Sequence, residues 1–327
     1  MATALVLGSN GQDGSYMAEV LLEQGHEVVG AARQPTSRWI DHPRFRHVQV
    51  DVGDAGELKR LLGDVKPSRI AALATVHGPS GHAYETDWRA ALDVNLGCIH
   101  TCLEYMRVQA PSARLFAASS LKAFGQNPPA VIDESTQRVS SCLYSITKNA
   151  AADLVSYYRS MHHLWAVTGF FFNHDSPRRP SEFFLPRLVD QLGAYLGGQE
   201  APPPLATLDF WCDWGSSLEF MRAAAALLAL DEPRDVVIAT GVSLYARDLA
   251  EALSEATGAT AESWVKARQA PQPKPPGAEP PYRANIQLLR GLVGQPPSDG
   301  LDVALWILRD RYGVDVGRPV KLPWRPN

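Results

Sequence analysis

Gly8-Ser9-Asn10-Gly11-Gln12-Asp13-Gly14 lies between a short apolar run at residues 4–7 and an amphipathic stretch at residues 15–23. In such a strand–loop–helix unit, glycines permit a tight turn and let backbone N–H groups approach a phosphate, and the helix N-terminus favours an anion. The spacing therefore predicts a dinucleotide-binding loop, with a purely structural turn as the alternative. The residues expected to contact the dinucleotide are Gly8, Asn10, Gly11, Gln12, Asp13 and Gly14.

Apolar runs of strand length alternate with amphipathic segments through the first half of the chain, which is the pattern of a parallel sheet covered by helices. The predicted strands are residues 4–7, 27–32, 48–50, 70–74, 115–118 and 166–172. The predicted helices are residues 15–23, 55–62, 88–106 and 145–161. We therefore expect a doubly wound α/β fold of the Rossmann type.

Proline-containing stretches at residues 175–186, 201–204 and 270–281 are typical of irregular loops around a second, smaller lobe. A short apolar run at residues 236–239 is expected to return to the main sheet, so that the two lobes are interleaved. We expect a dinucleotide-binding domain formed by residues 1–172 plus about 209–254. We expect residues of about 173–208, together with residues 255–327, to form the substrate-binding lobe.

The composition excludes several classes of protein. The 327 residues include 31 Lys and Arg against 35 Asp and Glu, a formal net charge of −4, so we expect no nucleic-acid partner. The longest nearly pure apolar run, residues 223–230, is far shorter than the roughly 20 residues of a membrane span, and we expect neither a leader nor a membrane contact. We expect a cytoplasmic protein with reduced thiols at Cys98, Cys102, Cys142 and Cys212.

The residues that end the second, third and fourth strands indicate which dinucleotide binds. An acid after the second strand suits the ribose of NAD, but this chain has Arg33 there, and an arginine suits the 2′-phosphate of NADP. NADP is therefore favoured, while a solvated arginine and NAD stay open. Asp51 and Val52 close the third strand, where a carboxylate can accept a hydrogen bond from the adenine amino group. Leu73 and Ala74 close the fourth strand and are expected to line the same site.

Tyr144 and Lys148 are spaced one helical turn apart and share one helix face. The lysine and a positively charged nicotinamide ring both stabilise a phenolate, so Tyr144 can take a hydroxyl proton while a hydride leaves for the cofactor. Ser120, at the end of a predicted strand, is expected to hydrogen-bond the same hydroxyl group, and Ser119 is expected to contact the substrate. A chance match to this common spacing is the alternative.

Several motifs together resemble a known family. They are residues 8–16, 144–148, 172–179, 213–215 and 238–242. With these segments the chain resembles the extended short-chain dehydrogenase/reductases, and within them it is most similar to the GDP-mannose 4,6-dehydratases. The resemblance spans residues 1 to about 245. It implies that His174, Arg178 and Arg179 lie near the cofactor and that Asn173 lies near the nucleotide part of the substrate.

One residue departs from the dehydratase pattern at the reacting centre. Those enzymes have a glutamate that removes the proton beside a transient C4 ketone and helps to expel the C6 hydroxyl group, whereas this chain has Lys122. A lysine confined beside Lys148 and an oxidised nicotinamide is expected to lose its proton more readily and to act as a neutral amine base. The arrangement is similar to the exo-glycal-forming 5,6-dehydratases of the tunicamycin type. The alternative is that Lys122 points away or pairs with an acid.

A second departure concerns the substrate. Cys212 stands where sugar-nucleotide enzymes usually have an arginine that contacts the diphosphate, so a nucleotide sugar and a less charged nucleoside-like sugar both stay open. Arg187 and Arg283 are expected to hold phosphate, since the family places basic residues near both positions. His77 or His82, after the fourth strand, is expected to touch the substrate, with a solvated loop histidine as the alternative.

These patterns predict a redox-neutral enzyme with a tightly held NAD(P) and no metal. It would oxidise a sugar hydroxyl group through Tyr144, Lys148 and Ser120, eliminate water with help from Lys122, and return the hydride, with exo-alkene formation favoured over 4,6-dehydration. An epimerase or ketoreductase of the same family is the alternative, and a non-catalytic dinucleotide-binding protein is the remote one. The resemblance also implies a homodimer or higher homo-oligomer, paired through the helices near residues 90–106 and 144–161.

Overall fold

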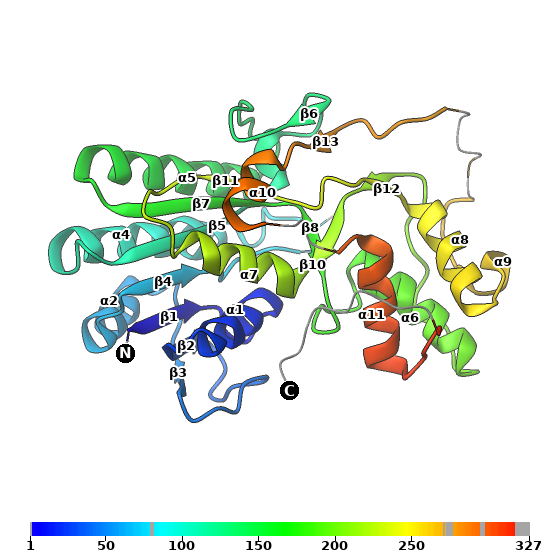
Figure 1. Cartoon of the computed structure of the whole chain (residues 1–327), viewed down its shortest axis with the longest axis horizontal. Helices are drawn as coiled ribbons and strands as arrows, with labels where there is room; N and C mark the ends of the chain where they lie inside the picture. The colour runs from blue at the N-terminus through cyan, green and yellow to red at the C-terminus, as the bar shows by residue number, and fades with distance from the viewer. Residues whose placement is uncertain (1, 79–81, 271, 273–276, 295–297, 318–327) are drawn as a thin grey trace.

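The computed structural model describes residues 2–78, 82–270, 272, 277–294 and 298–317. Among these residues seven parallel strands form the central sheet, in the order β11-β7-β5-β4-β1-β2-β3 (Figure 1). The strands are β1 Thr3–Leu7, β2 Glu27–Ala32, β3 Phe45–Gln49, β4 Arg69–Ala72, β5 Arg114–Ser120, β7 Trp165–Phe171 and β11 Val236–Ile238. The predicted doubly wound fold is confirmed, including the late strand that returns to the sheet edge.

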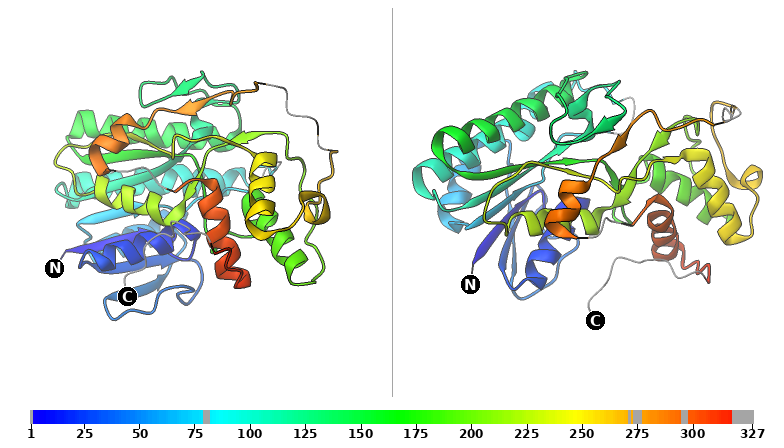
Figure 2. Two further views of the ribbon diagram at one scale, coloured as in Figure 1. Left: turned by 45° about the vertical axis from the view of Figure 1, so that its right-hand side comes forward. Right: turned by 45° about the horizontal axis from the view of Figure 1, so that its top comes forward.

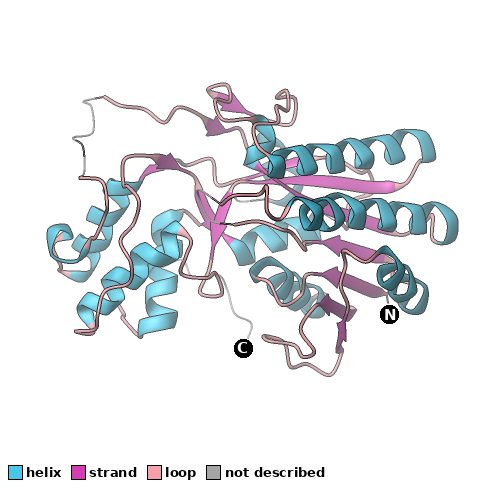
Figure 3. Ribbon diagram, turned by 180° about the vertical axis from the view of Figure 1, so that it is seen from behind, coloured by secondary structure: helices cyan, strands magenta, loops and turns pink. Residues whose placement is uncertain are grey.

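Helices cover both faces of the sheet, because successive side chains of each strand point to opposite faces. On β5, Phe116 packs with α1 and α7 on one face, and its neighbour Leu115 packs with α2, α4 and α5 on the other. Figure 3 views the molecule from behind and shows the helices of the second face in front of the strands. The covering helices are α1 Gln12–Glu23, α7 Ser217–Leu227, α2 Ala55–Val65, α4 Cys98–Gln109 and α5 Leu143–His162.

The predicted helix over residues 88–106 is interrupted. The structure has α3 (Trp88–Leu92), a π-helical turn at Asp93–Gly97 and then α4. The wider turn carries Asn95, whose Oδ1 accepts hydrogen bonds from Thr75 Oγ1 (3.0 Å) and from the N–H of Val76 (2.9 Å). Asn95 thereby fixes the loop that follows β4, which a local pattern of apolar residues does not reveal.

Strand β3 begins three residues earlier than the apolar run at residues 48–50 suggests. It is an edge strand, and polar residues alternate with Phe45 and Val48, so its apolar pattern is weak. Phe45 belongs to the strand because its ring packs on Gly30 of β2, where an added Cβ would lie 2.5 Å from Phe45 Cζ.

A second group of helices lies beyond the carboxyl ends of the strands (Figures 1 and 2). Its apolar cluster contains Leu188, Trp214, Leu249, Trp264 and Leu305, all of them buried. The helices are α6 Phe184–Leu196, α8 Ala246–Thr257, α9 Ala261–Trp264 and α11 Gly300–Tyr312.

The domain bounds stay a prediction, but two helices pack differently from the expected division. Helix α8, most of which we assigned to the sheet domain, packs into the second cluster through Leu249 and Leu253. Helix α10 (Gln287–Val293) places Leu289 in the cluster on one face of the sheet instead. Each helix closely follows a two-residue strand, Leu244–Tyr245 before α8 and Arg283–Ala284 before α10, and the local patterns did not predict either strand.

Short ladders connect these parts. Strand β8 pairs with β10 in parallel, β9 pairs with β12 in antiparallel, and β6 pairs with β13 in parallel. Their bounds are β6 Val131–Ile132, β8 Asn173–Asp175, β9 Trp211–Cys212, β10 Trp214–Ser216, β12 Leu244–Tyr245 and β13 Arg283–Ala284. No helix in the described ranges is long and apolar enough to span a membrane.

We predict that the chain tolerates alanine at Gly63 but not at Gly14. A Cβ at Gly14 would lie 2.1 Å from the Gly8 carbonyl oxygen, whereas a Cβ at Gly63, in α2, meets no heavy atom within 4 Å. Gly14→Ala should lower the free energy of unfolding by about 2 kcal/mol or more, as overpacking does. Gly63→Ala should leave it unchanged or raise it by up to about 1 kcal/mol, because alanine favours helix. Urea denaturation measures both, and equal stability of the two variants would contradict the prediction.

Candidate active site

Two cavities adjoin at the carboxyl ends of the strands. The first, of about 860 Å³, extends over the ends of β1 to β4, and the second, of about 430 Å³, extends from the ends of β5 and β7 to α6. Asp13, Leu73, Thr75 and Arg179 line both cavities. The first cavity lies where the strand order reverses between β1 and β4, the position at which α/β sheets bind ligands.

The phosphate loop leaves room for a ligand at the start of α1. Gly8 has φ +92°, and an added Cβ would lie 2.8 Å from the backbone nitrogen of Ala74. The Gly8 carbonyl accepts a hydrogen bond from the N–H of Gly11 (2.9 Å), which closes the turn. No side chain caps the N-terminus of α1 at Gly11. Gly11 lines the first cavity, so the N-terminus of α1 is open to that cavity. A loop free of side chains at an uncapped helix N-terminus fits the diphosphate of a dinucleotide.

Most of the other residues predicted to contact the dinucleotide also line the first cavity, whereas His174 and Arg178 do not. Arg33 is exposed at the wall of this cavity. Asp51 lines the same cavity, and its Oδ1 accepts a hydrogen bond from the N–H of Gly53 (2.9 Å). The side chain of Asn10 donates to the carbonyl of Thr36 (2.9 Å) and thus holds the loop that follows Arg33. The residues of this set that line the cavity are Gly8, Asn10, Gly11, Gln12, Asp13, Gly14, Arg33, Asp51, Val52, Leu73, Ala74 and Arg179.

Tyr144 and Lys148, on α5, line the second cavity and are each 4% exposed. Lys148 Nζ donates to the carbonyl of Ala118 (2.8 Å) and lies 5.7 Å from the centre of the Tyr144 ring. Burial raises the pKa of Tyr144 well above its ordinary value, while hydrogen bonds with Thr75 and Ser120 act in the opposite direction. Burial lowers the pKa of Lys148 to about 8. The structure therefore brings together the three predicted residues and adds Thr75, which the sequence analysis missed.

Lys122 lies on the short helical turn Leu121–Phe124 and lines the second cavity. Its backbone N–H donates to Ser120 Oγ (3.3 Å), so its place is fixed relative to the catalytic serine. The side chain is exposed, and the confinement that we expected is not observed. Among the described residues, no ion pair includes Lys122, so the alternative of a partner acid is not supported either.

His77 packs against the reactive tyrosine instead of lying in a solvated loop. Its ring centre is 4.8 Å from that of Tyr144, and Nδ1 lies 2.8 Å from the Tyr84 hydroxyl oxygen. Burial, helped by the nearby positive charges of Arg179 and Lys122, lowers the pKa of His77 to about 3, so the ring is neutral. His77 lines the second cavity, whereas the His82 Nε2 lies 3.1 Å from Asp87.

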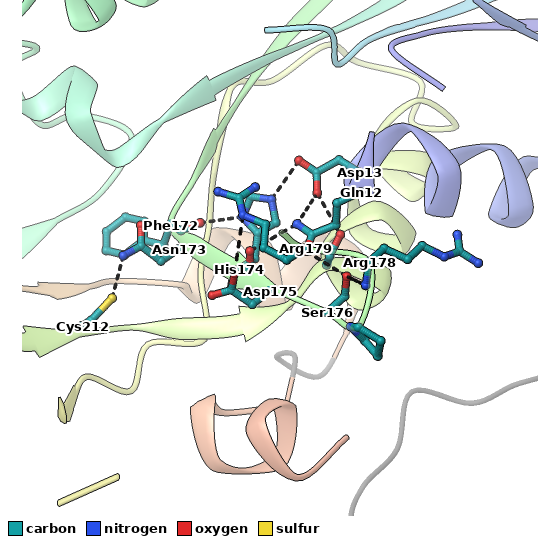
Figure 4. Close-up of polar contacts among 12 residues, drawn as sticks. Gln12, Asp13, Phe172, Asn173, His174, Asp175, Ser176, Arg178, Arg179 and Cys212 are labelled. Carbon is teal, nitrogen blue, oxygen red and sulfur yellow. Dashed lines mark hydrogen bonds and ion pairs between the residues drawn. The ribbon is translucent and has the colours of Figure 1, made fainter. Parts of the chain in front are cut away.

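Polar side chains join the phosphate loop to β8 (Figure 4). Ser176 Oγ donates to Gln12 Oε1 (2.8 Å), and His174 Nε2 lies 3.0 Å from Asp13 Oδ2. Ser217 Oγ, from α7, donates to Asp13 Oδ1 (2.8 Å). Two of the five segments that carry the family resemblance, residues 8–16 and 172–179, thus bind each other, and His174 lines the second cavity.

The two adjacent arginines have different surroundings. Arg178, expected near the cofactor, lies outside both cavity walls; it donates to Ser15 Oγ (2.9 Å) and Glu19 Oε1 (2.5 Å) and lies 4.0 Å over the Tyr16 ring. It therefore holds α1 in place. Arg179 lines both cavities, with its guanidinium 3.6 Å from the centre of the Phe183 ring.

Three more of the predicted substrate residues, Ser119, Asn173 and Arg187, line the second cavity. Asn173 Nδ2 donates to Cys212 Sγ (2.7 Å), and Arg187 Nε donates to the carbonyl of Ser181 (3.0 Å). Ser119 Oγ is buried at the cavity wall and has no hydrogen-bond partner among the described residues. Arg283 is exposed on β13 and is not brought to either cavity wall.

The second cavity also has an aromatic wall, formed by side chains that the sequence analysis did not group together. Phe184 lies edge-on to Phe210 (4.7 Å between ring centres) and stacks on Trp214 (5.5 Å). These residues come from α6, the loop before β9, and β10, so no local spacing joins them. Thr75 was detectable, since it follows Ala74 directly at the end of a predicted strand.

Comparison with known proteins agrees with this geometry. A family model described as GDP-mannose 4,6 dehydratase matches residues 5–283. A GDP-mannose 4,6-dehydratase from Yersinia enterocolitica is 30% identical over 278 residues, which cover 79% of this chain and 73% of that protein.

Solved structures share the fold at lower identity. The UDP-glucose 4-epimerase of Thermus thermophilus in complex with NAD has a TM-score of 0.78 at 22% identity and covers 95% of this chain and 99% of that chain. The dTDP-glucose 4,6-dehydratase of Bacillus anthracis in complex with NAD has a TM-score of 0.76 at 16% identity, covering 95% and 98%. With the sequence match over most of its length, the chain belongs to the GDP-mannose 4,6-dehydratase family.

Proposed function

We propose that this chain is an NAD(P)-dependent dehydratase that acts on a sugar carried by a nucleotide or nucleoside. The observation that carries the proposal is the position of Tyr144, which is buried with Lys148 and contacts Ser120 and Thr75, beside the junction of a cavity of dinucleotide size with a second cavity. The related proteins named above as dehydratases support elimination as the outcome.

The first step is oxidation of a sugar hydroxyl group. When bound, NAD(P) accepts a hydride from the substrate and later returns it. Lys148, one helical turn away, stabilises Tyr144 as a phenolate, and Tyr144 Oη then accepts the hydroxyl proton and becomes a neutral phenol. Ser120 hydrogen-bonds the reacting oxygen, so that the substrate is held before the tyrosine.

The second step is loss of water beside the new ketone. Lys122, as the neutral amine, takes the proton from the carbon next to the carbonyl group, and the C–O bond of the neighbouring hydroxyl group breaks. The ammonium group then gives a proton to the leaving hydroxide, so that water departs and the lysine is neutral again. Ser119, Asn173, Arg187 and His77 are proposed to hold the substrate in the second cavity, and a phosphate contact for Arg283 stays a prediction.

Mass spectrometry of products formed in deuterated water tests this proposal. The purified protein is incubated with a panel of nucleotide sugars and free nucleosides, and cofactor absorbance is recorded. We expect one substrate to lose one water with no net change in cofactor. Deuterium gained without loss of water would indicate epimerisation, net cofactor turnover would indicate a reductase, and a bound dinucleotide without any turnover would indicate a non-catalytic protein.

We predict that Lys122→Gln lowers kcat by at least about 100-fold, the usual contribution of a positioned acid–base group. The affinity for NAD(P) should change less than about twofold, because Lys122 lines only the second cavity. Lys59→Gln, at an exposed position on α2, is the matched control and should keep the parent activity. Turnover of Lys122→Gln within about twofold of the parent would exclude its role in elimination.

We predict that Arg33 selects NADP. Arg33→Ala removes a charge-assisted contact to the 2′-phosphate and should weaken NADP binding by about 10- to 100-fold. Binding of NAD, which lacks this phosphate, should change little and serves as the internal control. Isothermal titration of both dinucleotides measures the effect, and an equal loss for the two would contradict the assignment.

Homodimerisation and a cytoplasmic location stay predictions. Helices α4 and α5 leave Val108 (62% exposed), Tyr157 (52%) and Met161 (62%) at the surface, which supports pairing of two copies through these helices. Sedimentation velocity of the purified chain would show a single-copy mass if this pairing does not occur.

A further inference from the structure

The partly buried pair formed by Asp13 and His174 lies where the two cavities adjoin (Figure 4). Asp13 belongs to the first turn of α1 and lines both cavities, and His174 comes from β8 and lines the second. The side chains are 23% and 11% exposed, and His174 Nε2 lies 3.0 Å from Asp13 Oδ2. The steps proposed above do not use this pair.

The partners of His174 determine how many protons the ring carries. Nδ1 lies 2.7 Å from the carbonyl oxygen of Phe172, which can only accept a hydrogen bond. Nε2 faces the Asp13 carboxylate, which accepts further hydrogen bonds from Ser217 Oγ (2.8 Å) and Gln12 Nε2 (3.0 Å). The two donors Ser217 and Gln12 and the nearby positive charge of Arg179 favour the ionised form of Asp13. With Asp13 ionised, both ring nitrogens of His174 face acceptors and donate, so the ring is an imidazolium.

The surrounding charges agree with this state. Burial opposes charging of His174, but the neighbouring Asp13 outweighs it and raises the pKa of His174. Burial likewise opposes ionisation of Asp13, but His174 and Arg179 hold the pKa of Asp13 well below its usual range. Asp175 and Arg179 also face the imidazole, and Lys148 acts on Asp13 from α5.

We infer that His174 is a positioning residue for the dinucleotide, because its positive charge cancels the negative charge of Asp13 at the wall where the diphosphate binds. The inference rests on the proposed function in one respect, namely that the ligand of the first cavity is NAD(P). Without the imidazolium, the Asp13 carboxylate would face the two diphosphate charges without its hydrogen-bonded cation, and Arg179 and Lys148 would offset its charge only in part. The same contact ties β8, which carries Asn173, to the phosphate loop.

A charge-rescue experiment separates this role from simple packing. NAD is titrated into the nucleotide-free protein at pH 7, with the parent, His174→Gln and the double variant His174→Gln/Asp13→Asn. His174→Gln should weaken NAD binding about tenfold, the scale of one uncompensated charge near a surface. Adding Asp13→Asn should restore most of that affinity, since the uncompensated charge is then gone, whereas a packing defect at position 174 would persist.

Ser217→Ala is the matched control. It removes a neutral donor to the same carboxylate and lies on α7 outside both cavity walls, so NAD binding should weaken less than about threefold. Circular dichroism confirms that each variant is folded before it is titrated.

The pH profile of NAD affinity is a second readout. Because the pKa of His174 is raised above its ordinary value of 6.5, the imidazolium is complete below that value and is lost as pH rises through the raised pKa. Affinity of the parent should therefore fall on the alkaline side. NAD is used because the 2′-phosphate of NADP ionises near pH 6. Lys148 titrates in both proteins, so the difference between the parent and His174→Gln profiles isolates the histidine.

The outcomes are distinct. Parent-like NAD affinity in His174→Gln, or a double variant that binds as weakly as the single variant, would overturn the charge-compensating role of His174. A parent protein that binds neither NAD nor NADP would instead overturn the proposed function.

Discussion

The contact between the first turn of α1 and the segment after β7 is the interaction on which the site depends. Gln12 and Asp13 bind Ser176 and His174, and Arg178 reaches back to Glu19 on α1. Charge-assisted hydrogen bonds between partly buried groups are stronger than neutral ones. The contact therefore fixes one end of the dinucleotide cavity and one wall of the substrate cavity at the same time.

Burial adjusts the chemistry of the site in opposite directions for different groups. Removing water disfavours the charged form of every group, so the pKa of Tyr144 rises while those of Lys148 and His77 fall. His77 is thus a neutral, packed ring beside the tyrosine. Lys122 stays exposed at the cavity wall, where a bound substrate would be the group that covers it.

Of the two departures from the family pattern, Lys122 lines the second cavity, whereas Cys212 is buried against Asn173. Lys122 follows β5, which ends at Ser120, and Cys212 Sγ accepts a hydrogen bond from Asn173. Beside Cys212 the buried Asp213 accepts hydrogen bonds from the N–H groups of Thr240 and Gly241. The two departures therefore bear on different parts of the proposed reaction, Lys122 on the elimination and Cys212 on the surroundings of a residue proposed to hold the substrate.

The sequence by itself determined the fold class, the family, the glycine loop and the placement of Tyr144 and Lys148 on one helix face. Each of these depends on local spacing: a period of two or 3.6 residues, a glycine where a side chain would collide, or one helical turn between two groups. It also indicated that residues 8–16 and 172–179 matter together, although not that they bind each other.

Only the tertiary structure decided which side chains those local features meet. Arg178 and Arg179 are adjacent in the chain, yet one holds α1 and the other lines both cavities. The hydrogen bonds of Asn95 and the exposure of the Lys122 side chain likewise depend on segments that are distant in the chain. Such contacts arise when loops close over many residues, and no short-range pattern encodes the partner found at the other end.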